Sequence, residues 1–170
     1  SPNPQGVTTG LIESFVENYK SALSDLNIVR RDLGLAPPPH LDGATIGAFY
    51  TQPEDVDDAT LAQLALSDEM VGELEAADVI VIAAPMHNFG LASGLKSWID
   101  HVSRVGRTFN YTAEGPNGML TGKKVFVLGA RGGNYSSTSP AHGMDFVTPY
   151  LKTALGFIGL DDVTFINAEG

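Results

Sequence analysis

The residues best suited to chemistry in this chain follow an apolar run, VIVIAAP, that begins at Val79 and ends at Pro85. Proline has no amide hydrogen to donate to a strand ladder, so its position favours the end of a buried strand. The next four residues carry a thioether, an imidazole, an amide and an aromatic ring, in the order Met86, His87, Asn88 and Phe89. This set suits a flat heteroaromatic ligand with a hydrogen-bonding edge. The alternative is an ordinary strand-to-helix turn with Asn88 near a helix start.

A second group of polar residues stands at the opening of the chain, where Ser1, Thr8 and Thr9 supply hydroxyls. Gly6 and Gly10 permit close backbone approach, and the unpaired N–H groups of a predicted helix lie beside them. Such a helix start binds anions, so we predict a phosphate site there. The segment lacks the lysine of a nucleoside-triphosphate loop and has no GxGxxG spacing, which favours a single phosphate. The alternative is that these hydroxyls only cap the helix.

A third loop repeats the logic of the first. The apolar strand predicted over residues 124–129 leads into the sequence Ala130, Arg131, Gly132 and Gly133. The two glycines permit backbone N–H groups to approach the edge of a ligand. The alternative is a plain glycine turn, with Arg131 as an ion-pairing surface residue. Because ligands of open α/β sheets bind beyond the carboxyl ends of the strands, we expect the three loops to converge on one crevice.

Helical and extended patterns alternate along the chain, as in a doubly wound α/β protein whose parallel sheet is flanked by helices. We expect one domain over residues 1–170. Predicted helices cover residues 7–26, 60–76, 92–102 and 146–157, and predicted strands cover residues 27–32, 79–85, 124–129 and 163–167. No strand is predicted before the first helix and no helix after the last strand. We therefore expect a fragment from which a first strand and a last helix are missing.

The composition argues against several classes of protein. The 170 residues carry 20 acidic and 10 basic side chains, with no basic stripe for a nucleic acid backbone. With no cysteine the chain has no disulfide or thiolate ligand, and its Asp, Glu and His residues show no metal-ligand spacing, so we expect no metal. The longest apolar run is far shorter than the roughly 20 residues of a membrane span. We expect a cytoplasmic protein without a membrane or nucleic-acid partner.

Three motifs are highly specific in combination: PMHNF, RGG and PYLKTALGFIG. With them, residues 67–170 resemble the FMN-dependent NADH-azoreductase and quinone reductase family, which has a flavodoxin-like fold. The resemblance implies a phosphate site at Ser1, Val7, Thr8 and Thr9. It also implies that residues 86–89 and 130–133 form two loops that bind the flavin ring. At His87 the family usually carries an aromatic residue.

The same resemblance implies a homodimer with each flavin at the subunit interface. It further implies that Tyr111 and Phe157 help to form the substrate pocket. Both side chains are aromatic, and flat quinones or azo dyes stack on such rings. The alternative for Phe157 is a core position on its helix.

The loop after the RGG motif contains Tyr135 and His142. In order and approximate spacing they resemble the Tyr and His beside the flavin in mammalian NAD(P)H quinone reductases, although the spacing is one residue longer here. Such a pair would stabilise negative charge on the reduced flavin or protonate the product. The alternative is a solvated loop histidine. His40 and His101 are interpreted as a loop residue and a helix-surface residue.

The family resemblance, together with the three candidate loops, implies an FMN-dependent oxidoreductase that uses NADH to reduce quinones and azo compounds by two-electron hydride transfer. One site shared by donor and acceptor implies ping-pong kinetics. The N–H groups near Gly132 and Gly133 would stabilise charge on the reduced ring. A flavodoxin-type electron carrier, which an acidic surface suits, is the main alternative. A third hypothesis is a structural or regulatory protein that keeps the fold without a cofactor.

Overall fold

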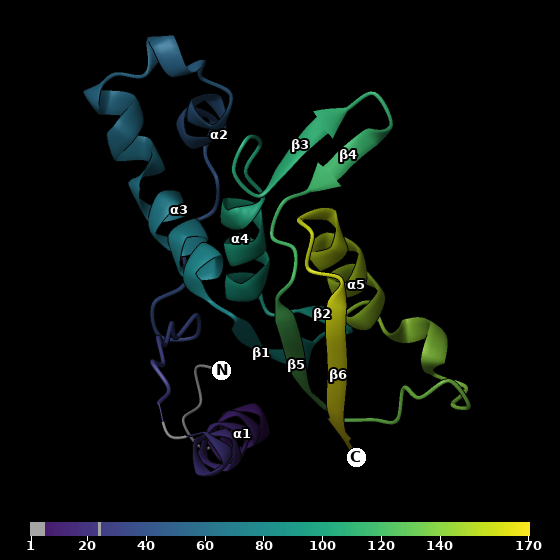
Figure 1. Cartoon of the computed structure of the whole chain (residues 1–170). Coiled ribbons are helices and arrows are strands. Elements are labelled where there is room, and N and C mark those ends of the chain that lie inside the picture. Colours follow the sequence, from purple (N-terminus) through teal and green to yellow (C-terminus); the bar gives the residue numbers. More distant parts are fainter. Residues whose placement is uncertain (1–5, 24) are drawn as a thin grey trace.

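The structure is a computed structural model that describes residues 6–23 and 25–170. Its helices are α1 (Val7–Ala22), α2 (Gly43–Phe49), α3 (Asp58–Ala76), α4 (Ser93–Val102) and α5 (Thr148–Phe157), with short 3-10 turns η1 (Pro53–Asp55) and η2 (His142–Met144). Its strands are β1 (Val79–His87), β2 (Gly90–Leu91), β3 (Phe109–Thr112), β4 (Gly115–Gly118), β5 (Lys124–Arg131) and β6 (Asp162–Glu169). Figure 1 shows the helices arranged around one central sheet.

The central sheet has the strand order β2-β1-β5-β6. The last three of these strands are parallel, and their register sets Ile82 beside Val127 and Val127 beside Phe165. β1 was predicted to end at Pro85, but it continues for two residues because Met86 and His87 pair with the antiparallel strand β2. The predicted α/β class with a largely parallel sheet is confirmed.

The two faces of the sheet carry different helices. Val125 and Val127 join a core formed with α3, α4 and α5, whose buried members include Met70, Leu74, Trp98, Ile99, Leu151 and Leu155. Phe126 lies between these valines, and successive strand residues point to opposite faces. Its ring contacts Phe15 of α1 at 4.9 Å between centroids. α1 therefore covers the face opposite to the main core.

The strand predicted over residues 27–32 is wrong. These residues have an irregular backbone and pair with no described strand. Side chains hold the segment instead: Arg30 bonds Glu13 of α1 at 2.6 Å, and Arg31 bonds Glu73 of α3 at 2.8 Å. A strand needs backbone partners in register, and an apolar pattern alone does not supply them.

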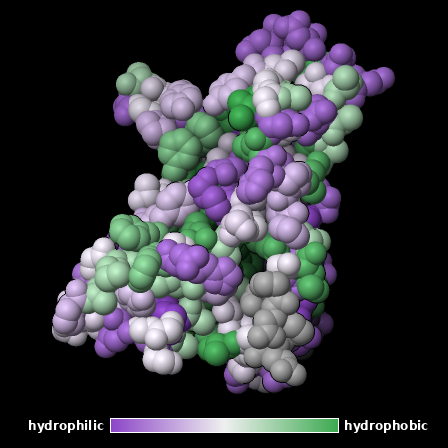
Figure 2. All heavy atoms as spheres, turned by 180° about the vertical axis from the view of Figure 1, so that it is seen from behind, coloured by the Kyte–Doolittle hydropathy of each residue, from purple (hydrophilic) through white to green (hydrophobic). Residues whose placement is uncertain are grey.

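The strands β3 and β4 form a separate hairpin, in the segment that was predicted to be an extended excursion or turn. The hairpin joins the end of α5 closely, because a Cβ on Gly118 would lie only 2.1 Å from the Gly159 nitrogen. From behind, the hairpin projects as a distinct lobe, whereas the end that carries α2 and η1 is mostly hydrophilic (Figure 2). Within the part of the chain that is described, no helix has the length and apolar character needed to cross a membrane.

Candidate functional site

A cavity of about 350 Å³ lies at the carboxyl edge of the sheet. Three chain segments line it, through Gly6, Val7, Thr8, Ala130, Arg131, Gly132, Ala168, Glu169 and Gly170. The structure thus brings the opening loop and the loop after β5 into one hollow, although they are far apart in the sequence. This is the place where open α/β sheets bind their ligands.

The first turn of α1 forms one wall of this cavity. The helix is capped by the backbone of Gly6, and within the described residues no side chain caps it. The first intrahelical bonds are made by Thr9 and Gly10, whose amides donate to the Gly6 carbonyl. The amides of Val7 and Thr8 precede those bonds, so they present the positive end of the helix dipole. Ser1, also predicted to bind phosphate, lies outside the described residues.

The turn between β1 and β2 has an unusual backbone. Asn88 and Phe89 have φ angles of 48° and 70°, and His87 pairs with Gly90 around them. Two successive positive φ values in a two-residue hairpin correspond to a type I′ turn, which normally takes Asn-Gly. A bulky residue at such an angle costs about 1–3 kcal/mol, and strain of this kind concentrates at functional sites. The helix-start alternative for Asn88 is therefore wrong, because the residue closes a strained hairpin.

This turn adjoins the cavity without lining it. Pro85 at the base of the turn lies beside Ala130 in the sheet register. The Phe89 carbonyl accepts a hydrogen bond of 3.1 Å from the Phe146 amide. Phe89 and Phe146 are 43% and 61% exposed, so two aromatic residues stand on the surface at this turn.

Arg131 forms ion pairs, as the alternative hypothesis stated, but it is not a surface residue. Its side chain is only 4% exposed and pairs with the Asp145 carboxylate at 3.0 Å and with Glu169 at 3.5 Å. Its second terminal nitrogen donates to the Thr148 hydroxyl. Burial alone raises the pKa of Asp145, but hydrogen bonds from Thr148 and Val147 and the charge of Arg131 lower that pKa below its ordinary value. The Asp145 carboxylate is therefore ionised at neutral pH.

Tyr135 and His142 lie together, and the His142 ring contacts the backbone of Tyr135. The Nδ1 of His142 donates to the Tyr135 carbonyl over 3.0 Å, because a carbonyl only accepts. In the neutral ring this bond keeps the proton on Nδ1, so Nε2 is the nitrogen left to accept a proton, and His142 is an exposed residue. The Tyr135 ring packs beside Gly133, 3.4 Å from where a Cβ would stand, and its amide donates to Glu169.

Tyr111 and Phe157 are joined through Phe109, whose ring contacts both. The Phe109 ring lies 5.6 Å from Tyr111 and 4.4 Å from Phe157. Tyr111 is 67% exposed, whereas Phe157 is half-buried against the core. The elements that carry this cluster, β3 and the end of α5, stand at the amino end of the sheet, beyond the start of β5 and β6 (Figure 1). The 8 residues of β5 separate it from the carboxyl edge by roughly 25 Å, so one chain does not bring it to the cavity.

His101 was predicted to lie on a helix surface, and this is wrong. It is 3% exposed, its Nε2 donates to the Pro39 carbonyl at 3.0 Å, and the ring of Phe49 packs on its edge. The loop before α2 covers this side of α4, a contact that sequence periodicity does not reveal. His40 is an exposed loop residue, as predicted.

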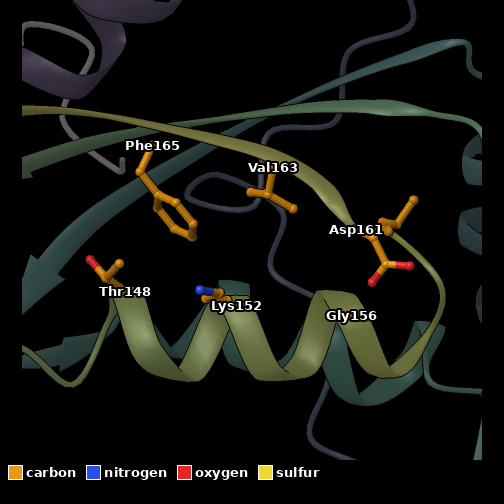
Figure 3. A pocket seen from close by; sticks show the side chains of 7 residues that line it. Thr148, Lys152, Gly156, Asp161, Val163 and Phe165 are labelled. Atoms are coloured by element: carbon orange, nitrogen blue, oxygen red, sulfur yellow. The ribbon is translucent and has the colours of Figure 1, made fainter.

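A second hollow of about 300 Å³ lies between α5 and β6. Figure 3 shows Val163 and Phe165 on the strand facing Thr148 and Lys152 on the helix, with Asp161 at one end. None of the predicted site residues lines it. Among the residues that the structure describes, no group of three or more His, Asp or Glu side chains is arranged to hold a metal ion.

A sequence profile of the family described as "flavodoxin-like fold" matches residues 1–170. The chain belongs to this family. The predicted fold class and the stated resemblance are thereby confirmed.

Relatives of this flavodoxin-like chain carry names that specify an activity. The "FMN-dependent NADH:quinone oxidoreductase" of Herminiimonas arsenicoxydans is 55% identical over 157 residues, which are 92% of this chain and 76% of the relative. The protein of the same name from Acidobacterium capsulatum is 47% identical over 170 residues, covering 100% of this chain and 82% of its own. Among solved structures, an "FMN-dependent NADH-azoreductase" from Bacillus anthracis in complex with FMN gives a TM-score of 0.87 at 25% identity, over 99% of this chain and 82% of that one.

Sequence reasoning missed several residues of the site in this flavodoxin-like domain. Asp145 and Glu169 hold Arg131, Phe146 holds the turn at Phe89, and Phe109 joins the two predicted substrate residues. An Asp four residues before Pro-Tyr favours a turn that leads into a helix, and Asp145 does accept from the Val147 and Thr148 amides just before α5. No sequence signal indicates its pairing with Arg131.

Proposed function

We propose that this flavodoxin-like protein is an FMN-dependent oxidoreductase that uses NADH to reduce quinones and azo compounds. The observation that carries the proposal is the cavity where the start of α1 meets the glycine loop after β5. Relatives with 55% and 47% identity bear the name FMN-dependent NADH:quinone oxidoreductase. When bound, FMN supplies the hydride chemistry, and the chain supplies binding, orientation and electrostatics.

The start of α1 suits the single phosphate of FMN. The amides of Val7 and Thr8 would donate to it, and the hydroxyls of Thr8 and Thr9 add further donors. Ser1 is proposed as a fourth contact from the sequence alone. The first turn of α1 contains no acidic residue to oppose an anion. The sequence motifs indicate only one phosphate site and no pyrophosphate-binding glycine motif, which supports FMN over FAD.

The isoalloxazine ring suits the two loops at the carboxyl edge. The amide of Asn88 would hydrogen-bond its polar edge, while Met86, His87 and Phe89 would stand along the ring. A Cβ on Gly132 would meet no atom within 4 Å, so open space lies beside that backbone. We assign to the Gly132 and Gly133 amides the stabilisation of negative charge on the reduced ring. For Arg131 only the backbone is available to a ligand, since its guanidinium is engaged within the protein.

His142 is proposed to exchange a proton during the reaction. Its Nδ1 proton is bound to the Tyr135 carbonyl, so the exposed Nε2 is the nitrogen able to accept or release a proton. Tyr135 would help to place this imidazole next to the glycine loop. Donor and acceptor would occupy the same surface in turn, which supports ping-pong kinetics.

The substrate pocket is proposed to form between two copies of the chain. Tyr111 and Phe157 stand about one strand length from the cavity, yet aromatic rings suit a flat acceptor. A homodimer in which the projecting hairpin of one copy reaches the carboxyl edge of the other would satisfy both facts. We further propose a cytoplasmic location, with which a chain that lacks cysteine is compatible.

The second candidate is an electron carrier without a substrate of its own, which the net charge of −10 favours. One experiment separates the two. The purified protein should be yellow, release FMN on denaturation, bleach on addition of NADH alone, and regain its colour with a quinone. Bound flavin that NADH does not bleach would instead support the carrier.

A further inference from the structure

The buried pair of Arg131 and Asp145 is costly to place inside the protein. Its two charged side chains are 4% and 7% exposed and lie 3.0 Å apart. Removing two charges from water can cost as much as their attraction returns, so such a pair is weak evidence of a stabilising role. A function other than stability is therefore worth seeking.

The pair joins three elements at the edge of the cavity. Arg131 is the last residue of β5, and the sheet register sets it beside Glu169 of β6. Its guanidinium also donates to Thr148 in the first turn of α5. One oxygen of Asp145 forms the ion pair with Arg131, and the other accepts hydrogen bonds from the Val147 and Thr148 amides. The end of β5 is thus tied to the start of α5.

The connection continues to the strained turn. Phe146, which follows Asp145, donates its amide to the Phe89 carbonyl at 3.1 Å. Gly132, on the other side, follows Arg131 directly and lines the cavity. Covalent neighbours and hydrogen bonds therefore form an unbroken path from one proposed ring-binding loop to the other.

We propose that the Arg131–Asp145 pair is a positioning device that holds the loop of residues 130–133 and the turn of residues 86–89 in the relative geometry that the flavin ring requires. Neither side chain needs to touch the ring. The pair acts because a charged, multiply bonded contact fixes orientation more narrowly than apolar packing does. This inference rests on the proposed FMN-dependent function.

The test begins with Asp145→Asn, which keeps an oxygen to accept from the Val147 and Thr148 amides and removes the charge. Asp68→Asn is the matched control, because Asp68 pairs at 3.1 Å with Arg104, another buried arginine, away from the carboxyl edge. Both variants should unfold more easily. We expect Asp145→Asn alone to raise the dissociation constant of FMN about tenfold and to change the visible circular dichroism of the bound flavin. Asp68→Asn should leave both properties as in the parent.

A second variant distinguishes the loss of positioning from simple misfolding. Arg131→Met combined with Asp145→Asn removes both charges, and apolar replacement of a buried pair is often neutral for folding. A folded double variant should still show weaker FMN binding and altered dichroism. Parental affinity and dichroism in either folded variant overturn the proposal. So does failure of both variants to fold, since the pair is then a folding determinant. If the parent protein itself does not bind FMN, the proposed function fails instead.

Discussion

At the scale of single residues, the turn at Asn88 and Phe89 has an unusual backbone conformation. Both residues have positive φ angles, although neither is glycine. Asparagine tolerates this region better than phenylalanine, because its short polar side chain forms local hydrogen bonds. The cost of the phenylalanine is understandable if the turn presents its side chains to a ligand.

Replacement of Asn88 by glycine should separate backbone strain from ligand binding. Glycine keeps the left-handed backbone without cost, so the free energy of unfolding should stay close to that of the parent. Loss of the amide leaves a polar ring edge unpaired, and FMN affinity should fall by about 1–3 kcal/mol. Flavin fluorescence titration measures the affinity, and urea denaturation measures stability. Unchanged affinity would remove Asn88 from the proposed site.

His142→Gln should affect the reaction more than flavin binding. The exposed Nε2 lies on a ring held by the Tyr135 carbonyl, a geometry suited to proton exchange. We expect slower turnover and a changed pH profile of kcat, while flavin content stays near that of the parent. His40→Gln, in an exposed loop, is the control and should change neither. A parental rate and pH profile would return His142 to a solvated loop histidine.

At the scale of elements, the start of α1 works through its backbone. Val7 is 63% exposed and stands in the first turn, beside the cavity. An anion at this helix start would meet the positive end of the helix dipole, and no side chain of the described residues caps the helix.

Val7→Asp should therefore have opposite effects on stability and on FMN binding. A carboxylate at a helix start stabilises the helix by about 0.3–1 kcal/mol, so the flavin-free protein should be as stable as the parent or more so. The same charge repels a phosphate, so FMN affinity should decrease. Riboflavin, which has no phosphate, is the control ligand. Equal losses of affinity for FMN and riboflavin would contradict a phosphate site at α1.

At the scale of the whole molecule, the carboxyl-edge cavity and the aromatic cluster of Phe109, Tyr111 and Phe157 lie at opposite ends of the sheet. A hairpin that projects from the body suits contact with a second copy (Figure 2). In a twofold dimer each site would then combine the turn of one subunit with the hairpin of the other.

Mixing two impaired variants tests this arrangement. Asn88→Gly and Tyr111→Ala should each lower activity as separate homodimers. After unfolding and refolding together, half of the dimers are mixed, and one of their two sites carries both parental residues, so about a quarter of the sites should recover. Mixing Asn88→Gly with Val7→Asp, whose positions lie on the same side of the site, is the control and should restore nothing. The absence of recovery with Tyr111→Ala would contradict a shared pocket.

The sequence by itself determined the α/β class, the family, and the loops after β1 and β5 as candidate binding loops. These features are local: hydrophobic runs, glycines and a proline, and short motifs act over a few neighbouring residues. The same locality explains the wrong strand at residues 27–32, since an apolar pattern does not state whether a partner strand lies beside it.

Only the tertiary structure decided how the pieces meet. It placed Asp145 and Glu169 on Arg131, buried His101 beneath Pro39, and set the β3–β4 hairpin, which carries Tyr111, at the end of the sheet opposite to the cavity. Each of these features involves residues that are distant in the sequence, so it depends on how strands pair and helices pack. The tertiary structure also decided the left-handed backbone of Phe89. Pairing with β2 and the hydrogen bond from the Phe146 amide hold this residue at a φ angle that phenylalanine does not prefer.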